Sequence, residues 1–277
     1  MIRLICSDMD GTLLDEDSRM PPETFGLIRE LSQAGVRFCV TSGRRYDTLC
    51  EFFEPVVCDM DFVASNGCQV YVQGTMIDRE IYSHKAVIKL AQVVRMFDCL
   101  HLMLNDRTHT FLLDDIGKYE RAIDKDLRNN LRVKEVPAPE VNILKGSIYC
   151  EDATYLMDMT YALDRELGDS FRFAPSDKRW IDVMPRYVSK ATGIQQVMAH
   201  YGITPDQVMA FGDSMNDYEI LRLVGHPVAM QNARYAVQQI SERTIGTNSE
   251  HSVQREMRKV LDDLAAERGA AGEPAGR

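Results

Sequence analysis

The sequence has no long apolar run, and this absence is the first restriction on what the protein can be. No stretch approaches the roughly 18 consecutive apolar residues that a membrane-spanning helix needs, so we expect no membrane partner. The N-terminus, MIRLICSD, is too short and too early acidic for a secretory signal peptide. Together these features predict a cytoplasmic protein.

Cysteine pairs of the kinds that build disulfide frameworks or zinc sites are also missing. The chain has seven cysteines, an odd number, and no C-x-x-C pair. Cys6 and Cys39 lie inside apolar, strand-like runs, which is typical of reduced and buried thiols. We therefore expect neither a disulfide-stapled fold nor a cysteine-ligated metal.

An excess of positive charge is the third absence. Lysine and arginine number 32 against 42 aspartates and glutamates, for a formal net charge of -10. This balance disfavours nucleic-acid binding, which depends on a basic surface. A small anionic substrate remains compatible with it, because one local cation can outweigh the global field. With 277 residues the chain can bury a large core, either as one domain with an insertion or as two domains.

Strand-like and helix-like segments alternate in the first and last thirds of the chain. Apolar strands are predicted at 2–7, 36–41, 61–64, 207–211 and 227–230, and a hairpin at 69–82 turning at Gln73-Gly74. The middle third mixes strand pairs with helices, one of them over 116–129. This pattern predicts an α/β fold, in which a doubly wound, Rossmann-like parallel sheet (1–82 and 183–270) carries an inserted α+β cap domain (83–182). The tail, 271–277, is expected to be disordered.

The stretch Asp8-Met9-Asp10-Gly11-Thr12 follows the first predicted strand, and alone it fits an ordinary turn. However, ligands of parallel α/β sheets bind beyond the carboxyl ends of the strands. Three further apolar runs end in polar residues, namely Thr41-Ser42-Gly43-Arg44, Gly212-Asp213-Ser214-Met215-Asn216-Asp217, and RWIDVMP, which is followed by Lys190 at a helix start. Four such ends together predict one site rather than four unrelated turns.

These residue types suit a magnesium-assisted reaction on a phosphoryl group. Mg²⁺ takes oxygen ligands, usually one or two carboxylates, and Asp8 and Asp213 are the best candidates. Lys190, the Ser42 hydroxyl and the backbone N–H of Gly43 would balance the charge of the phosphoryl group.

A pair of carboxylates completes the proposed chemistry. An ionised aspartate can attack phosphorus and form an aspartyl-phosphate. A second acid two residues later can protonate the leaving oxygen and then activate water. Asp8 and Asp10 have this spacing.

In these motifs the chain resembles the haloacid dehalogenase superfamily of aspartate-nucleophile phosphatases, and within it the Cof-type subfamily with a type II cap. The resemblance spans nearly the whole chain. Its four motifs correspond in order to Asp8–Leu13, Ser42-Gly43-Arg44, Lys190 and Gly212–Asp217, and Ser65-Asn66-Gly67 and Met230–Ala233 resemble accessory signatures. Gln231 stands where the family usually has glycine, and His251-Ser252-Val253 where it has Asp-Gly-Val, both away from the chemistry.

The resemblance implies a role for each matched residue. Asp8 would be the nucleophile and a metal ligand. Asp10 would be the general acid and base and would give its backbone carbonyl to the Mg²⁺, and Asp213 would ligate it too. Asn216 would contact phosphate, and Asp217 would hold Lys190 or a metal-bound water.

Three assignments stay open at this point. Thr41 is an alternative to Ser42 as the phosphate-binding hydroxyl. Arg44 is expected to reach the substrate phosphate. Asn66 fits either a turn or the site.

Hydrolysis of a small phosphate monoester (a sugar phosphate, nucleotide or cofactor phosphate) is therefore the leading hypothesis. The partner would be a small phosphorylated metabolite. A phosphomutase would pass the same phosphoryl group to another sugar hydroxyl, and a non-catalytic binding or regulatory module would keep only the fold. The acid at Asp10 favours a phosphatase or a mutase over a dehalogenase or an ion pump, which lack it in this superfamily. The sequence indicates neither the substrate nor the oligomeric state.

Overall fold

The computed structural model describes residues 1–277 except 80, 114–116, 120–128, 177 and 273–277. The chain forms two compact units: Met1–Asp78 with Lys190–Arg277, and Arg79–Ser189. The second unit is thus inserted between two segments of the first. It includes the whole of the predicted insert, 83–182. Of the tail predicted to be disordered, 271 and 272 end the last helix, and the rest lies outside the described residues.

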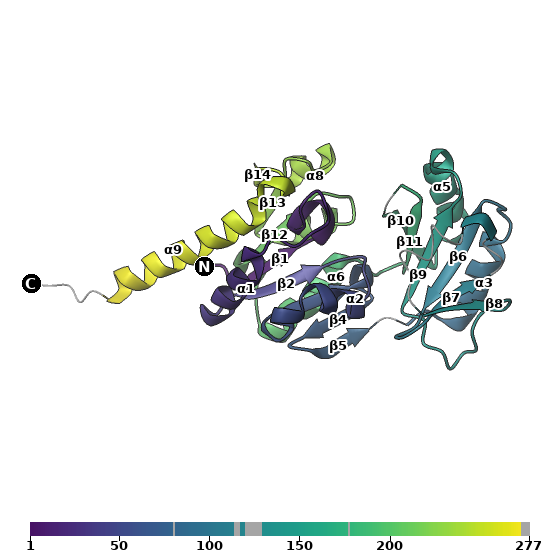
Figure 1. The fold of residues 1–277 in the computed structure, drawn as a ribbon, viewed down its shortest axis with the longest axis horizontal. Helices are drawn as coiled ribbons and strands as arrows, with labels where there is room; N and C mark the ends of the chain where they lie inside the picture. The colour runs from purple at the N-terminus through teal and green to yellow at the C-terminus, as the bar shows by residue number, and fades with distance from the viewer. Residues whose placement is uncertain (80, 114–116, 120–128, 177, 273–277) are drawn as a thin grey trace, which may run out of the picture. The chain divides into compact units, whose positions relative to one another are not determined.

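The first unit is built on a largely parallel sheet (Figure 1) with the strand order β14-β13-β12-β1-β2-β3-β4-β5. Every neighbouring pair from β14 to β3 is parallel, and β4 is antiparallel to β3. The strands are β1 (Leu4–Ser7), β2 (Arg37–Thr41), β3 (Asp61–Ala64), β4 (Gln69–Val72), β5 (Thr75–Arg79), β12 (Val208–Gly212), β13 (His226–Met230) and β14 (Arg243–Ile245). The predicted parallel α/β fold is confirmed.

Helices cover both faces of this sheet, because alternate residues of its buried strands point to opposite sides. Ile5 and Phe38 pack with α1 (Glu23–Gln33), α2 (Tyr46–Phe52) and α9 (Ser252–Gly272). Leu4 and Cys39 pack with α6 (Lys190–Tyr201), α7 (Tyr218–Leu223) and α8 (Tyr235–Ile240). The shorter helical segments are η1 (Met9–Leu13), η2 (Glu54–Asp59), η3 (Ser65–Gly67), η6 (Pro205–Gln207) and η7 (Asn248–Glu250).

The hairpin of β4 and β5 turns where the sequence predicted, at Gln73 and Gly74. Both residues have left-handed backbones, with φ of 49° and 76°. Two consecutive positive φ values match the tight turns whose twist suits a two-residue hairpin.

The second unit has a six-stranded sheet with the order β10-β11-β9-β6-β7-β8. All its described strand pairs are antiparallel except β7 with β8. The strands are β6 (Leu100–Asn105), β7 (Thr110–Leu113), β8 (Asn130–Val133), β9 (Lys145–Cys150), β10 (Phe171–Pro175) and β11 (Trp180–Pro185). Its helical segments are α3 (His84–Val94), η4 (Gly117–Tyr119), η5 (Ala153–Tyr155) and α5 (Leu156–Leu167). The α+β character expected for the insert is confirmed.

Two segments, RWIDVMP and 116–129, differ from the expectation or lie largely outside the described residues. The run RWIDVMP was grouped with the strand ends of the parallel sheet, but as β11 it pairs with β9 and β10 in the second unit. The grouping was wrong because an apolar run shows that a strand is buried, not which sheet it joins. Most of the helix predicted at 116–129 lies outside the described residues. Among the described residues, no helix is long and apolar enough to cross a membrane.

Candidate active site

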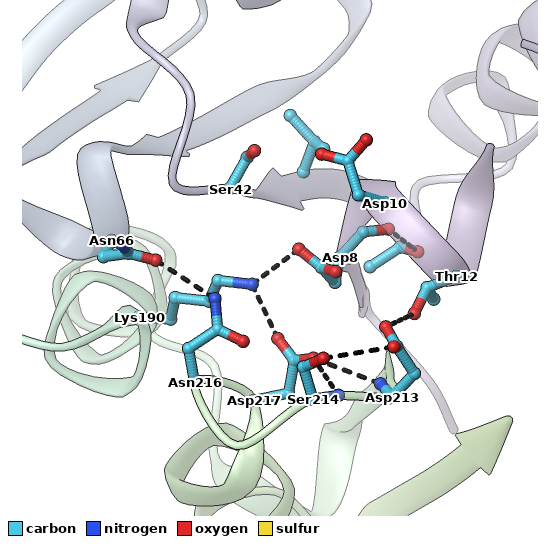
Figure 2. Close-up of polar contacts among 12 residues, drawn as sticks. Asp8, Asp10, Thr12, Ser42, Asn66, Lys190, Asp213, Ser214, Asn216 and Asp217 are labelled. Atoms are coloured by element: carbon cyan, nitrogen blue, oxygen red, sulfur yellow. Dashed lines mark hydrogen bonds and ion pairs between the residues drawn. The ribbon is translucent and has the colours of Figure 1, made fainter. Parts of the chain in front are cut away.

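Asp8 is the first residue beyond β1, and the neighbouring strand β12 holds it in place. Its backbone N–H donates to the carbonyl of Phe211 at 3.1 Å, which continues the ladder one residue past the strand. Its side chain is buried, at 9% exposed. From Met9 the chain turns into η1, so Asp10 does not continue the extended strand and its carboxylate is half exposed, at 50%. Figure 2 shows Asp8 pointing to Lys190 and Asp10 pointing elsewhere.

Lys190 is the first residue of α6, and its ammonium lies at the centre of the site. The Nζ donates to Asp8 Oδ1 at 2.5 Å and to Asp217 Oδ1 at 2.6 Å, with the lysine side chain fully buried (Figure 2). Burial alone would lower the pKa of Lys190. The charges of Asp217 and Asp8 outweigh burial and raise that pKa above its ordinary value. The ammonium is therefore a permanent cation at physiological pH.

The carboxylates of Asp8, Asp213 and Asp217 have oxygens that all lie within 4.8 Å of one another. Burial, followed by the charge of Asp217, raises the pKa of Asp8 well above its ordinary range, although Lys190 opposes this. Burial and Asp217 also raise the pKa of Asp213 to about 6. One lysine cannot balance three ionised acids, so this cluster has a deficit of positive charge.

That deficit and the donor set fit a hard divalent cation. Carboxylate oxygens are the ligands that Mg²⁺ takes in proteins, and a bound cation would let crowded acids stay ionised. Asp213 is also held in position, because Thr12 Oγ1 donates to its Oδ1 at 2.8 Å and Ser214 Oγ to its Oδ2 at 3.2 Å. Such fixed ligand orientation is what metal sites use to tune affinity.

The loop after β12 owes its shape to Asp217. Its Oδ2 accepts from the backbone N–H groups of Asp213 and Ser214, both at 3.1 Å, while its Oδ1 binds Lys190. Asp217 therefore joins the loop that carries Asp213 to the buried lysine; its role in the reaction stays a prediction.

Gly11 allows η1 to approach this loop closely. Its φ is +80°, and a Cβ there would lie 2.8 Å from Asp213 Oδ2. Asn232 Nδ2 donates to the Gly11 carbonyl at 2.7 Å, which fastens the turn from a third segment. Sequence reasoning assigned no role to Thr12 or Asn232, although both lie within the quoted motif and accessory stretches.

Ser42 follows β2 and is buried, at 1% exposed. Its N–H donates to the Val63 carbonyl, and its Oγ accepts from the N–H of Arg44 at 3.1 Å. Because Oγ accepts that bond, the Ser42 hydroxyl proton points elsewhere and can serve a phosphoryl oxygen. Thr41 is equally buried but is the last residue inside β2. The choice of Ser42 over Thr41 stays a prediction.

Arg44 binds a partner that the sequence did not indicate. Its Nε and Nη2 donate to the two carboxylate oxygens of Asp10, at 3.0 and 2.7 Å. Its guanidinium also lies over the Phe52 ring, 4.8 Å from the centroid. This ion pair uses two of the five guanidinium N–H groups, and the phosphate contact expected of Arg44 stays a prediction.

Asn216 reaches across to the turn after β3. Its Nδ2 donates to Asn66 Oδ1 at 3.3 Å (Figure 2). Its Oδ1 is buried and has no hydrogen-bond partner among the described residues. The sequence thus brings Asp8, Lys190, Asp213 and Asp217 into one cluster, with Asp10, Ser42 and Asn216 around it.

The fold and this cluster define a class of protein: an α/β protein with a candidate active site at the carboxyl ends of its parallel strands. Residues 5–257 match the haloacid dehalogenase-like hydrolase family, and the chain belongs to that family.

Among the hydrolases of this family, similar proteins are named as phosphatases. The chain is 27% identical over 262 residues to the 5-amino-6-(5-phospho-D-ribitylamino)uracil phosphatase YbjI of Escherichia coli K12, covering 94% of this chain and 96% of that one. It is 25% identical over 244 residues to the HMP-PP phosphatase of Citrobacter koseri, covering 84% of this chain and 85% of the relative. The predicted phosphatase of the Cof-type group is confirmed.

Solved structures agree on the fold. A protein from Streptococcus mutans UA159 superposes with a TM-score of 0.87 at 20% identity, covering 95% of this chain and all of the other. At this identity the likeness establishes the shared architecture.

Proposed function

We propose that this phosphatase hydrolyses small phosphate monoesters with Mg²⁺ and an aspartyl-phosphate intermediate on Asp8. The observation that carries the proposal is the buried contact of Lys190 with Asp8 and Asp217, next to Asp213. A buried carboxylate beside a permanent cation suits attack on an anionic phosphoryl group.

The metal would be held by Asp8 and Asp213, with the backbone carbonyl of Asp10 as a further ligand. When bound, Mg²⁺ would neutralise charge on the phosphoryl oxygens and keep the clustered acids ionised. The surplus of acids over Lys190 supports this assignment, because the cluster needs a second cation for charge balance.

In the first step an Asp8 oxygen forms a bond to phosphorus as the bond from phosphorus to the ester oxygen breaks. Asp10 gives its proton to the departing alcohol. In the second step Asp10 takes a proton from water, whose oxygen attacks phosphorus and releases inorganic phosphate and Asp8. Lys190 and Ser42 hold the phosphoryl oxygens through both steps.

The ion pair with Arg44 gives Asp10 a resting position. Because Arg44 occupies both carboxylate oxygens, Asp10 must exchange this partner before it reaches a leaving-group oxygen. The exchange costs little free energy, since the pair is partly exposed and such pairs contribute about 0–1 kcal/mol.

We also propose that the inserted unit, Arg79–Ser189, acts as a cap that limits water access and selects the leaving group. Its position as an insertion between β5 and α6 supports this role. The relatives named above act on 5-amino-6-(5-phospho-D-ribitylamino)uracil and on HMP-PP, so both compounds belong in a substrate panel beside sugar phosphates, nucleotides and cofactor phosphates. We expect the protein to work in the cytoplasm, where such metabolites occur.

The test is a phosphate-release assay with p-nitrophenyl phosphate and then the panel, with Mg²⁺ and with EDTA. We expect activity that EDTA abolishes, and none from Asp8→Asn. Borohydride reduction of protein quenched during turnover should convert Asp8 to homoserine, which peptide mass spectrometry detects. Failure to release phosphate from any compound would contradict the proposed function, and release without a trapped Asp8 adduct would contradict the intermediate. Isomerised product with little free phosphate would indicate a mutase.

A further inference from the structure

The turn Ser65-Asn66-Gly67 between β3 and β4 has an unusual backbone. All three residues lie in the left-handed region, with φ of 50°, 55° and 105°. Residues other than glycine rarely adopt this conformation because Cβ approaches the following carbonyl, and asparagine tolerates it better than most. The turn therefore carries strain that its surroundings must maintain.

Two backbone hydrogen bonds tie the turn to the segment that follows β2. The N–H of Ser65 donates to the Arg44 carbonyl, and the N–H of Asn66 donates to the Ser42 carbonyl, both at 2.9 Å. The turn is consequently fixed beside Ser42, one of the residues assigned to the phosphoryl group.

From this position Asn66 reaches Asn216, a residue 150 positions later in the chain. Asn66 Oδ1 accepts from Asn216 Nδ2 at 3.3 Å, and Asn66 is only 3% exposed. On the other side of the Asn216 amide, Oδ1 is buried without a hydrogen-bond partner among the described residues. The described hydrogen bonds thus orient this amide through its nitrogen alone, by way of Asn66.

We propose that Asn66 is a positioning residue that fixes the amide orientation of Asn216, so that its Nδ2 keeps one N–H for a phosphoryl oxygen. This inference rests on the proposed function and extends it. Phosphoryl oxygens of a dianion only accept hydrogen bonds. A flipped Asn216 amide would turn its Oδ1, a hydrogen-bond acceptor, toward the phosphoryl oxygen, which is also an acceptor. The hydrogen bond from Nδ2 to the phosphoryl oxygen would then be lost.

A simpler explanation of Asn66 is that the turn requires positive φ and asparagine happens to satisfy it. Glycine satisfies that requirement at least as well, because it has no Cβ. Asn66→Gly therefore removes the amide contact while it relieves the strain. The two explanations predict opposite results for this one variant.

We expect Asn66→Gly to lower kcat/KM about fivefold, the value of one net hydrogen bond of roughly 1 kcal/mol. Inhibition by inorganic phosphate should weaken by a similar factor, while the urea midpoint of unfolding stays equal or rises. In an Asn216→Ala background, Asn66→Gly should cause no further loss, because the group it positions is gone. Ser65→Gly is the matched control: it relieves the adjacent positive φ without touching Asn216, so activity should match the wild type.

Wild-type kcat/KM and phosphate inhibition in Asn66→Gly would overturn the proposal. An equal loss in the wild-type and Asn216→Ala backgrounds would overturn it as well, since the effect would not pass through Asn216. If the wild type releases no phosphate from any substrate, the proposed function fails separately. Calorimetric binding of inorganic phosphate to the wild type and to Asn66→Gly then still decides the role of Asn66.

Discussion

The site has a buried half and an exposed half, and the same kinds of charged groups behave differently in each. In the buried half, the Lys190 side chain is 0% exposed and touches Asp8 and Asp217. In the exposed half, Arg44 and Asp10 form a bidentate ion pair whose side chains are 31% and 50% exposed. Water screens the second pair and not the first. The buried half is therefore fixed, whereas the exposed half can change partners during a reaction.

Removal of Lys190 should give the largest effect, because it leaves buried acids without their cation. Lys190→Met should lose about 3–5 kcal/mol in the free energy of unfolding. Its turnover should fall about 10³-fold, as when a single charge-stabilising donor is removed. Urea unfolding without metal and steady-state assays measure both.

A double variant is the control for that prediction. Lys190→Met with Asp217→Asn removes one uncompensated charge, so part of the stability should return while turnover stays low. A Lys190→Met protein as stable as the wild type would contradict the buried half as described here.

Asp213→Asn should weaken Mg²⁺ use at least about tenfold, since the metal would lose a charged ligand. A Mg²⁺ titration of activity measures the shift, and saturating metal should recover part of the turnover. Asp17→Asn removes an exposed acid with the same chemical change and should leave the titration unaltered. Identical Mg²⁺ curves for Asp213→Asn and the wild type would remove Asp213 from the metal site.

The free energy of unfolding should also depend on pH through Asp213, which lies beside the buried half of the site. The pKa of Asp213 is raised to about 6, so between about pH 4 and pH 6 the folded protein binds a proton that the unfolded chain has released. Rising pH therefore destabilises the metal-free wild type through this group, on the order of 1 kcal/mol over the interval after allowance for partial exposure. Asp213→Asn should gain stability relative to the wild type as pH rises. Unfolding in EDTA at pH 4 and pH 6 tests this. If the stability of Asp213→Asn minus that of the wild type falls as pH rises, the prediction is refuted.

Arg44→Gln should give the smallest effect on folding. An exposed ion pair contributes less than about 1 kcal/mol, and 1 M salt should abolish the difference from the wild type. The deficit of Lys190→Met should persist in the same salt, because burial excludes screening ions. A large, salt-resistant loss in Arg44→Gln would show that the two halves are not distinct.

Much of the site could be predicted because its main residues follow apolar strands. Asp8, Ser42 and Asp213 come directly after β1, β2 and β12, which are neighbours in the sheet. The apolar runs marked these strands, and parallel strands bring their carboxyl ends to one edge. Lys190, which the sequence singled out, reaches the cluster from the first turn of α6 and not from a strand of this sheet.

The side-chain partners could not be predicted in the same way. Periodicity gives the face on which a residue lies, but it does not give the rotamer of a long side chain or its partner. Arg44 meets Asp10 across 34 positions, and Thr12 meets Asp213 across 201. β8 was missed for a different reason: its residues are half-buried or exposed, so no apolar run marks it.

The return of the chain from the inserted unit has a consequence for how such proteins can be rebuilt. Ser189 closes that unit, and the next residue is Lys190, whose ammonium touches Asp8. The outgoing crossing, at Asp78 and Arg79, lies at the end of an edge strand instead. When the inserted unit is exchanged between relatives, the length and sequence of the joint at Asp78 and Arg79 can therefore vary freely. At the incoming joint, a shift of one residue would rotate the position of the Lys190 ammonium by about 100° around its helix.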